Sequence, residues 1–263
     1  DVPKTLFALN ASINSTVFLQ DKGEDGAALH RPKVIGSATE GAMILMLRKW
    51  SIDYQSLRDA HFNAATDIQF PFNSTKKRST AILTNYNNKV LLLCKGASEV
   101  VLRDCTHYTN EGGQVVPLDN TKRNELELLI DAMAGRALRT LAVAHRDFNS
   151  IGDLGDGYKE DPPDNKNLIL DTIIGIIDPL RSDVKGAVAS AQGAGVMVRM
   201  VTGDNIITAK AIARNCGILT GEGETLTKER WEALVKQGGG ALEAILPKVC
   251  AIEGPAYRNL TPK

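Results

Sequence analysis

Residues 79–99 read STAILTNYNNKVLLLCKGASE, and this stretch decides the fold. Two β-rich runs, 79–86 and 89–94, are joined by the pair Asn87-Asn88. Asparagine tolerates a positive φ, which a tight two-residue hairpin turn needs at its central positions. The sequence therefore predicts a β-hairpin, and the second strand is too apolar to be exposed.

The flanking chain, from about residue 6 to residue 150, mixes helical patterns with short β segments. Apolar residues recur at helical spacing in 6–14, 40–50 and 119–135, and 139–144 is typical of a further strand. Hairpins accompanied by helices of this kind favour a largely antiparallel sheet that is backed by helices.

The pattern changes after a polar linker at 150–167. An apolar run at 168–177 predicts a buried strand, and it is followed by a helix near 184–191, a strand at 196–201 and a helix at 206–216. Strand-helix-strand-helix order is the signature of a parallel sheet. The predicted fold class is therefore α/β, with an α+β domain joined to part of a parallel α/β domain.

The tetrapeptide Thr202-Gly203-Asp204-Asn205 lies where the last predicted strand meets the last predicted helix. A strand would deliver the Thr202 hydroxyl to its carboxyl edge, and Gly203 would allow a tight turn. The helix that follows offers unpaired N–H groups to an anion. A plain βα turn, with Asp204 or Asn205 as an ordinary N-cap, remains the alternative on this evidence.

Composition restricts the class of protein. The 263 residues are 43% hydrophobic, enough for a core, and 31 Lys and Arg balance 31 Asp and Glu, which disfavours nucleic-acid binding. No apolar run approaches the roughly 20 residues that span a bilayer. The four cysteines lack CxxC spacing, so we expect buried free thiols at Cys94, Cys105, Cys216 and Cys250.

Five segments, in this order along the chain, carry a family resemblance. They are IGSATE at 35–40, KGASE at 95–99, DPLR at 178–181, VRMVTGDN at 198–205 and AIEGPAYRNL at 251–260. Together they resemble the signatures of P-type ATPases. The segment 198–205, with Thr208-Ala209, is most similar to the calcium-pumping branch, and 251–260 is similar to the calcium pumps of plasma membranes and plant vacuoles. The resemblance extends from about residue 6 to residue 260.

The resemblance implies a domain plan. Residues 1–177 would form the nucleotide-binding domain, and 178–263 part of a haloacid-dehalogenase-like phosphorylation domain. The family's DKTGT motif, with its phosphorylated aspartate, would precede residue 1, and its TGDGxND motif would follow Lys263. We therefore expect this chain to bind ATP without turning it over. Relative to the pumps, 220–248 would be an insertion with a short helix near 228–235.

In the intact enzyme, the resemblance implies that ATP with Mg²⁺ is presented to that aspartate to drive calcium transport. The implied partners are ATP and the transmembrane and actuator parts of the same polypeptide, with calmodulin a candidate outside this chain. The implied location is the cytoplasmic face of the plasma membrane or of an internal calcium-store membrane.

Lys95 is the strongest site candidate from the residues themselves. It follows a buried strand and precedes Gly96, so we expect its ammonium to emerge at a flexible turn and to face the nucleotide. A lysine that snorkels from a strand end is the alternative. Glu40 would lie at the pocket rim, where a carboxylate can accept from the adenine amino group, while it also satisfies a capping box with Ser37.

The remaining site residues are implied by the family match. Phe72 would stack on adenine, although a core Phe beside Phe70 is the alternative, and Lys77 would be the pocket lysine while Lys76 and Arg78 stay in solvent. Thr202, Gly203 and Asp204 would bind the phosphoryl group in the intact pump. The nucleotide-binding set is Thr39, Glu40, Phe72, Lys77, Lys95, Gly96, Arg139, Leu141 and Arg181.

Three other functions are alternatives, of which the first two remain open and the third is disfavoured. A P-type ATPase could transport another cation, since ion selectivity lies in transmembrane segments. A non-catalytic nucleotide-binding or docking module would keep the pocket without the chemistry. A free-standing haloacid-dehalogenase-like phosphatase would need its own aspartate nucleophile after an apolar strand, and the sequence contains no such arrangement.

Overall fold

The computed structural model describes residues 2–23, 25–219, 224–226 and 250–252. The chain divides into two compact units. The first unit contains residues 1–130 and 140–176, and the second contains 131–139 and 177–263. Each unit is described by itself.

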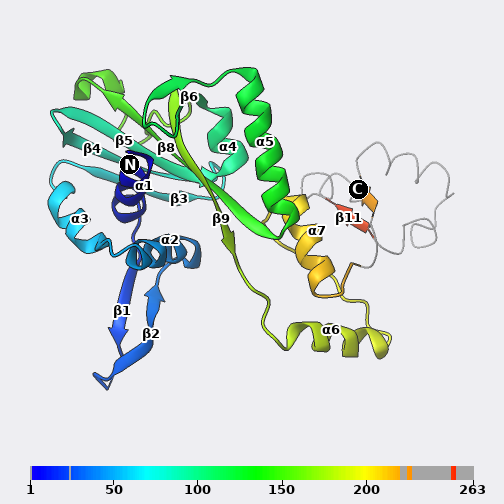
Figure 1. Ribbon diagram of the computed structural model, residues 1–263. Helices are drawn as coiled ribbons and strands as arrows, with labels where there is room; N and C mark the ends of the chain where they lie inside the picture. The colour runs from blue at the N-terminus through cyan, green and yellow to red at the C-terminus, as the bar shows by residue number, and fades with distance from the viewer. Residues whose placement is uncertain (1, 24, 220–223, 227–249, 253–263) are drawn as a thin grey trace. The chain divides into compact units, whose positions relative to one another are not determined.

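A mixed seven-stranded sheet, in the order β3-β4-β5-β8-β9-β6-β7, organises the first unit (Figure 1). Its strands are β3 (Ile68–Asn73), β4 (Arg78–Tyr86), β5 (Lys89–Ala97), β6 (Cys105–Thr109), β7 (Val115–Pro117), β8 (Leu138–Phe148) and β9 (Leu168–Ile177). The pairs β3–β4, β4–β5, β5–β8 and β6–β7 are antiparallel, whereas β6 and β9 are parallel. The predicted antiparallel sheet backed by helices is confirmed.

The predicted hairpin forms as β4 and β5. Asn87 and Asn88 have φ values of 51° and 62°, as a primed two-residue turn requires. Tyr86 pairs with Lys89 across the turn. The apolar run of β5 is buried on both faces of the sheet, which explains why its sequence does not alternate.

Helices cover both faces of this sheet. They are α1 (Val2–Ile13), α2 (Ala38–Lys49), α3 (Tyr54–His61), α4 (Ser98–Arg103) and α5 (Asn120–Gly135). Ala142 and Ala144 of β8 pack in one cluster with α4 and α5, whereas Val143 between them packs in another with α1 and α2. Alternate side chains of a strand point to opposite faces, so β8 lies between two cores.

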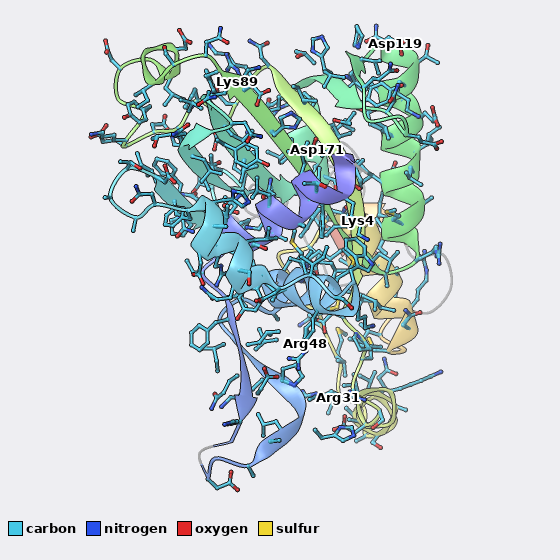
Figure 2. The ribbon with its side chains drawn as sticks, turned by 60° about the vertical axis from the view of Figure 1, so that its left-hand side comes forward. Lys4, Arg31, Arg48, Lys89, Asp119 and Asp171 are labelled. Carbon is cyan, nitrogen blue, oxygen red and sulfur yellow. The ribbon has the colours of Figure 1, made fainter. Side chains whose placement is uncertain are left out.

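A two-stranded hairpin, β1 (Phe18–Lys22) and β2 (Ala28–Ile35), and the short 3₁₀ helix η1 (Ile151–Leu154) complete the first unit. Arg48 of α2, labelled in Figure 2, pairs with Asp21 of the hairpin at 2.5 Å. Both side chains are exposed, so the pair contributes little to stability.

Besides the end of α5, the described part of the second unit contains two helices and a small parallel sheet. These elements are α6 (Val184–Gly193), α7 (Ile206–Asn215), β10 (Glu224–Leu226) and β11 (Cys250–Ile252). Asn205 caps α7, because its side chain accepts a hydrogen bond from the Thr208 N–H at 2.9 Å. Both predicted helices are confirmed, and Asn205 rather than Asp204 is the N-cap.

The predicted strand-helix-strand unit of a parallel sheet is wrong for the described residues. The run 168–177 is indeed a strand, but β9 joins the mixed sheet of the first unit. Residues 196–201 are not a strand, and Val201 is 98% exposed. Within the described part of the second unit, no strand lies beside this run to take its backbone hydrogen bonds.

The sequence predicts buried free thiols, and the structure agrees at the three cysteines whose side chains it describes. Cys94, Cys105 and Cys216 are buried free thiols, and burial raises the pKa of the Cys94 thiol to about 12. The Cys250 side chain, the predicted helix near 228–235 and most of the predicted insertion lie outside the described residues. None of the described helices combines the length and the apolar character needed to cross a membrane.

Candidate functional site

The candidate nucleotide site is a small hollow in the first unit, of about 30 Å³. It lies where the end of α1, the start of α2 and strands β3 and β4 meet. Its lining residues are Asn14, Ser15, Thr16, Glu40, Gln69, Phe70, Pro71, Phe72 and Ser79. Enclosed ligand sites have volumes of roughly 300–1,000 Å³, so a nucleotide base here would lie on an open surface.

A larger cavity of about 390 Å³ lies elsewhere in the first unit, between α1, α3 and the end of β4. Its lining includes Lys4, Ile52, Leu57, His61 and Tyr86 and none of the predicted site residues. We assign the functional site to the smaller hollow, because it combines an exposed aromatic ring with a carboxylate and a buried cation, whereas size alone favours the larger cavity.

Lys95 of β5 is buried directly beneath the hollow, with 4% of its side chain exposed. Its ammonium donates to Glu40 Oε1 at 2.6 Å, to Ser79 Oγ at 2.8 Å and to the Asn14 carbonyl. An ammonium has three N–H donors, so these three acceptors occupy all of them. Burial lowers the pKa of Lys95, while the charge of Glu40 opposes the shift.

The prediction that Lys95 emerges at a flexible turn is wrong. Gly96 lies within β5 and is buried, and a Cβ there would stand 2.4 Å from the Lys77 carbonyl oxygen. The Ala97 N–H donates to that same carbonyl at 3.0 Å. Gly96 therefore permits close approach of the chain before β4, and it is not a hinge.

Glu40 lies in the first turn of α2, and the predicted capping box does not form. Its Oε2 accepts from Ser15 Oγ at 3.2 Å while Oε1 binds Lys95, so the carboxylate turns away from the helix start. Within the described structure, the Ser37 side chain makes no capping hydrogen bond. Thr39 is half-buried beside Glu40 in the same turn.

Phe72 presents its ring to solvent at the end of β3, with 60% exposed, so it is not a core residue. Phe70 packs against the core instead. Strict alternation would give the two side chains one face, but the register with β4 shifts between Phe70 and Asn73. Phe70 and Phe72 both line the hollow, and the register shift accompanies the difference in exposure between their rings.

The run Lys76-Lys77-Arg78 separates into three environments. Lys77 is exposed in the β3–β4 turn with φ 53°, and Lys76 is exposed and pairs with Asp161. The prediction that Arg78 stays in solvent is wrong. Arg78 is 5% exposed, its guanidinium lies 2.5 Å from the Asp104 carboxylate, and it also donates to the Asp164 carbonyl.

Leu141 of β8 is half-buried and packs against the cluster formed with α1 and α2. Its register partner on β5 is Ala97. It therefore lies two residues along the strand pair from Val143, the partner of Lys95.

In the second unit, Arg139 and the TGDN turn come together. The Arg139 guanidinium donates to Asp204 Oδ1 at 2.9 and 3.0 Å. Thr202 Oγ1 donates to Asp204 Oδ2 at 2.9 Å and accepts from the Asp204 N–H at 3.1 Å. Thr202 and Gly203 are exposed, as is Arg181 in the loop after β9. The turn thus orders Asp204 without the predicted strand.

Sequence reasoning missed Asn14, which ties the hollow to the sheet. Its side chain donates to the Ser79 and Leu93 carbonyls at 3.0 and 3.3 Å, and to Asn10 Oδ1 at 3.2 Å. A signal existed in the sequence. Two asparagines four residues apart in the mostly apolar run 6–14 need buried hydrogen-bond partners.

Comparisons with known proteins identify the family of the chain. The family described as "P-type ATPase, cytoplasmic domain N" matches residues 4–183. The chain is 39% identical over 228 residues to the calcium-transporting ATPase PAT1 of Dictyostelium discoideum, covering 86% of this chain and 19% of that protein.

Two further relatives give the same picture. Identity is 41% over 191 residues with calcium-transporting ATPase 10, plasma membrane-type, of Oryza sativa subsp. japonica, covering 73% of this chain and 18% of that one. The chain is 34% identical over 244 residues to the human plasma membrane calcium-transporting ATPase 4, and the match covers 90% of this chain and 19% of that protein. The chain spans about a fifth of the length of these relatives. It belongs to the P-type ATPase family and contains that family's cytoplasmic domain N.

Proposed function

We propose that this chain is the ATP-binding part of a calcium-transporting P-type ATPase. It would present ATP to a phosphorylatable aspartate in another part of the pump. The observation that carries the proposal is the Lys95–Glu40 ion pair next to the exposed ring of Phe72, within a chain of this family. The names of its relatives, which are calcium-transporting ATPases, support the choice of ion.

In this proposal the adenine stacks on Phe72, and its exocyclic amino group donates to Glu40. Lys95 holds Glu40 in place and adds positive potential beneath the nucleotide, since its three N–H groups already have acceptors. Thr39, Gly96 and Leu141 shape the surrounding surface. Lys77, exposed at the β3–β4 turn, is available to the phosphates.

On the phosphoryl side we assign Thr202, Gly203 and Asp204, with Arg139 and Arg181 as phosphate contacts in the intact pump. Residues 1–177 then form the nucleotide-binding domain and 178–263 part of the phosphorylation domain. Among the described residues, no group of three or more His, Cys, Asp or Glu side chains gathers as a metal site. Mg²⁺ is commonly bound through the phosphates of a nucleotide substrate, so we assign it to the phosphates of the incoming ATP.

The partners that this function requires are the transmembrane and actuator parts of the same pump, and calmodulin is a candidate regulator outside this chain. The chain would work at the cytoplasmic face of the plasma membrane or of an internal calcium store.

The test is a calorimetric titration of the chain with ATP, without and with Mg²⁺. An open hollow predicts a Kd of about 1 mM, which is roughly 4 kcal/mol of binding. Lys95→Ala and Phe72→Ala should lose binding while circular dichroism shows that the fold persists. Lys89→Ala, on the same strand as Lys95, and Phe18→Ala, another half-exposed aromatic, are the matched controls.

A folded wild-type chain that does not bind ATP would contradict the proposal. Equal losses in the control variants would contradict the site assignment. The transported ion is tested separately, by ATP-dependent uptake of radioactive calcium into vesicles that carry the full-length pump. Uptake of another cation instead of calcium would overturn that part of the proposal.

A further inference from the structure

Arg58 of α3 donates hydrogen bonds to three backbone carbonyls of one short segment. Its Nε donates to the Ser12 carbonyl at 2.6 Å, and its Nη2 donates to the Ser15 and Val17 carbonyls at 2.9 and 2.8 Å. The segment 12–17 is the C-terminal end of α1 and the loop that follows it. The last carbonyls of a helix lack helical hydrogen-bond partners, and the C-terminal end of a helix attracts cations. The Arg58 guanidinium supplies both N–H donors and a positive charge here.

The opposite side of this segment forms part of the candidate site. The Asn14 carbonyl accepts from the Lys95 ammonium, and the Ser15 hydroxyl donates to Glu40 Oε2 at 3.2 Å. Both residues line the hollow. The segment is therefore held by Arg58 on one side, and it orients Lys95 and Glu40 on the other.

Arg58 is itself held in place. Its guanidinium lies 4.8 Å from the centre of the Tyr54 ring, and the Tyr54 hydroxyl accepts from the Leu19 N–H at 3.1 Å. The side chain is half-buried. A planar fork with several fixed donors can serve three carbonyls at once, which the single ammonium of a lysine cannot do with the same geometry.

We propose that Arg58 is a positioning residue, which sets the Lys95–Glu40 pair and thereby the choice of base, through the segment 12–17. The base-selective part rests on the proposed function. A fixed carboxylate accepts from the amino group of adenine, whereas guanine would bring its O6 acceptor against the same carboxylate. Releasing the segment lets Glu40 turn, so adenine should lose its advantage over guanine.

The experiment compares Arg58→Ala and Arg58→Lys with Arg123→Ala. Arg123 is the matched control, because it is also half-buried and donates to two backbone carbonyls, those of Leu102 and Cys105, both at 2.6 Å. Neither of these carbonyls belongs to the lining of the hollow. Arg123→Ala therefore removes a similar clamp without touching the site.

Two quantities are measured for each variant. The first is the ratio of the Kd values for GTP and ATP, and the second is the rate at which N-hydroxysuccinimidyl acetate acetylates Lys95 without nucleotide, followed by mass spectrometry. Arg58→Ala should lower the ratio about ten-fold, the loss of one well-aligned hydrogen bond to a charged group. It should also accelerate acetylation of Lys95, since the Asn14 carbonyl no longer holds the ammonium.

Arg58→Lys should lie between wild type and Arg58→Ala in both quantities, and Arg123→Ala should leave both unchanged even where its unfolding midpoint falls. A folded Arg58→Ala protein with the wild-type ratio and the wild-type acetylation rate overturns the inference. Equal acceleration in Arg123→Ala also overturns it, because general loosening would then explain the effect.

Acetylation separates this inference from the proposed function. If wild type binds no ATP but Lys95 reacts faster in Arg58→Ala alone, the nucleotide assignment fails and Arg58 still positions the pair. If Arg58→Ala does not fold, Ser15→Ala takes its place, since it removes the hydroxyl that binds Glu40 and keeps the carbonyl that binds Arg58. A wild-type ratio in Ser15→Ala overturns base selection through this segment.

Discussion

The Lys95 ammonium and the Glu40 carboxylate lie 2.6 Å apart, with 4% and 14% of their side chains exposed. The pair joins the interior strand β5 to the first turn of α2. A buried ion pair contributes little net stability compared with an apolar pair, but removing one partner leaves the other charge uncompensated. The pair therefore makes the geometry of the site costly to disturb.

Lys95→Ala should lower the free energy of unfolding by about 3 kcal/mol, because it removes the buried partner of the Glu40 carboxylate. Urea unfolding at neutral pH measures the change. Lys89→Ala is the control on the same strand, since Lys89 and Asp147 are about half exposed and 3.9 Å apart. The control should change by less than about 1 kcal/mol, and equal effects in the two variants would show that Glu40 is well solvated.

Phe72→Ala should leave the free energy of unfolding within about 0.5 kcal/mol of wild type, because the ring is already in solvent. Phe70→Ala should destabilise the chain by about 3 kcal/mol, since Phe70 packs against the core. Chemical denaturation of both variants makes the comparison. A large loss in Phe72→Ala would place its ring in the core rather than at the nucleotide surface.

Arg78→Ala should be strongly destabilising, by about 3–5 kcal/mol, because it leaves the buried carboxylates of Asp104 and Asp164 without the guanidinium that pairs with them. The neighbouring Lys76→Ala should change stability by less than about 1 kcal/mol, since Lys76 and Asp161 are exposed. Thermal and urea unfolding of the two variants test the contrast. Similar stabilities would mean that Arg78 is not buried with its partners.

Gly96→Ala should destabilise the chain by about 1–3 kcal/mol, because the added Cβ would overlap the Lys77 carbonyl oxygen. Gly186 in α6 is the control. Apart from its chain neighbours and the nearby backbone of its own helix, no described atom lies within 4 Å of a Cβ added there, so Gly186→Ala should stabilise by about 0.5–1 kcal/mol through helix propensity. The two substitutions should change the free energy of unfolding in opposite directions. A Gly96→Ala variant as stable as wild type would refute the close approach.

His145 of β8 is buried, with Nδ1 2.7 Å from Asp171 Oδ1, and Thr109 Oγ1 donates to the same oxygen at 3.1 Å. Burial by itself would lower the pKa of His145, but the hydrogen bond and charge of Asp171 outweigh burial and raise it, with a further contribution from Asp147. The unfolded imidazole has a pKa of about 6.5.

Because the folded pKa of His145 is raised, its contribution to stability is present below about pH 6.5 and is lost as pH rises through the folded value. Unfolding free energies measured from about pH 5.5 to 9 should fall more steeply in wild type than in the double variant His145→Gln/Asp171→Asn. His30→Gln is the control, since His30 is exposed on β2. Identical slopes in wild type and the double variant would contradict the charged pair.

Several elements could be predicted from the sequence, because interactions between residues close together in the chain determine them. Asn87-Asn88 specifies a primed turn because both residues tolerate positive φ, and Asn205 specifies a helix start because its side chain reaches the N–H three residues on. The helices in 6–14 and 40–50 could be predicted from the spacing of their apolar residues alone, without knowing what they pack against. The five ordered motifs pointed to the P-type ATPase family before any geometry was known.

Tertiary structure decided which charges are buried and what they face. Lys76, Lys77 and Arg78 are adjacent cations in the sequence, yet Arg78 is buried because Asp104 and the Asp164 carbonyl lie beside it. Lys95 turns to Glu40, 55 residues away in the chain, instead of to solvent. The run 196–201 is apolar enough for a strand, but a strand forms where neighbouring backbone takes its hydrogen bonds. Such partners are distant in sequence, so composition and spacing predict the elements, whereas the burial and pairing of these charges arise only when the chain folds.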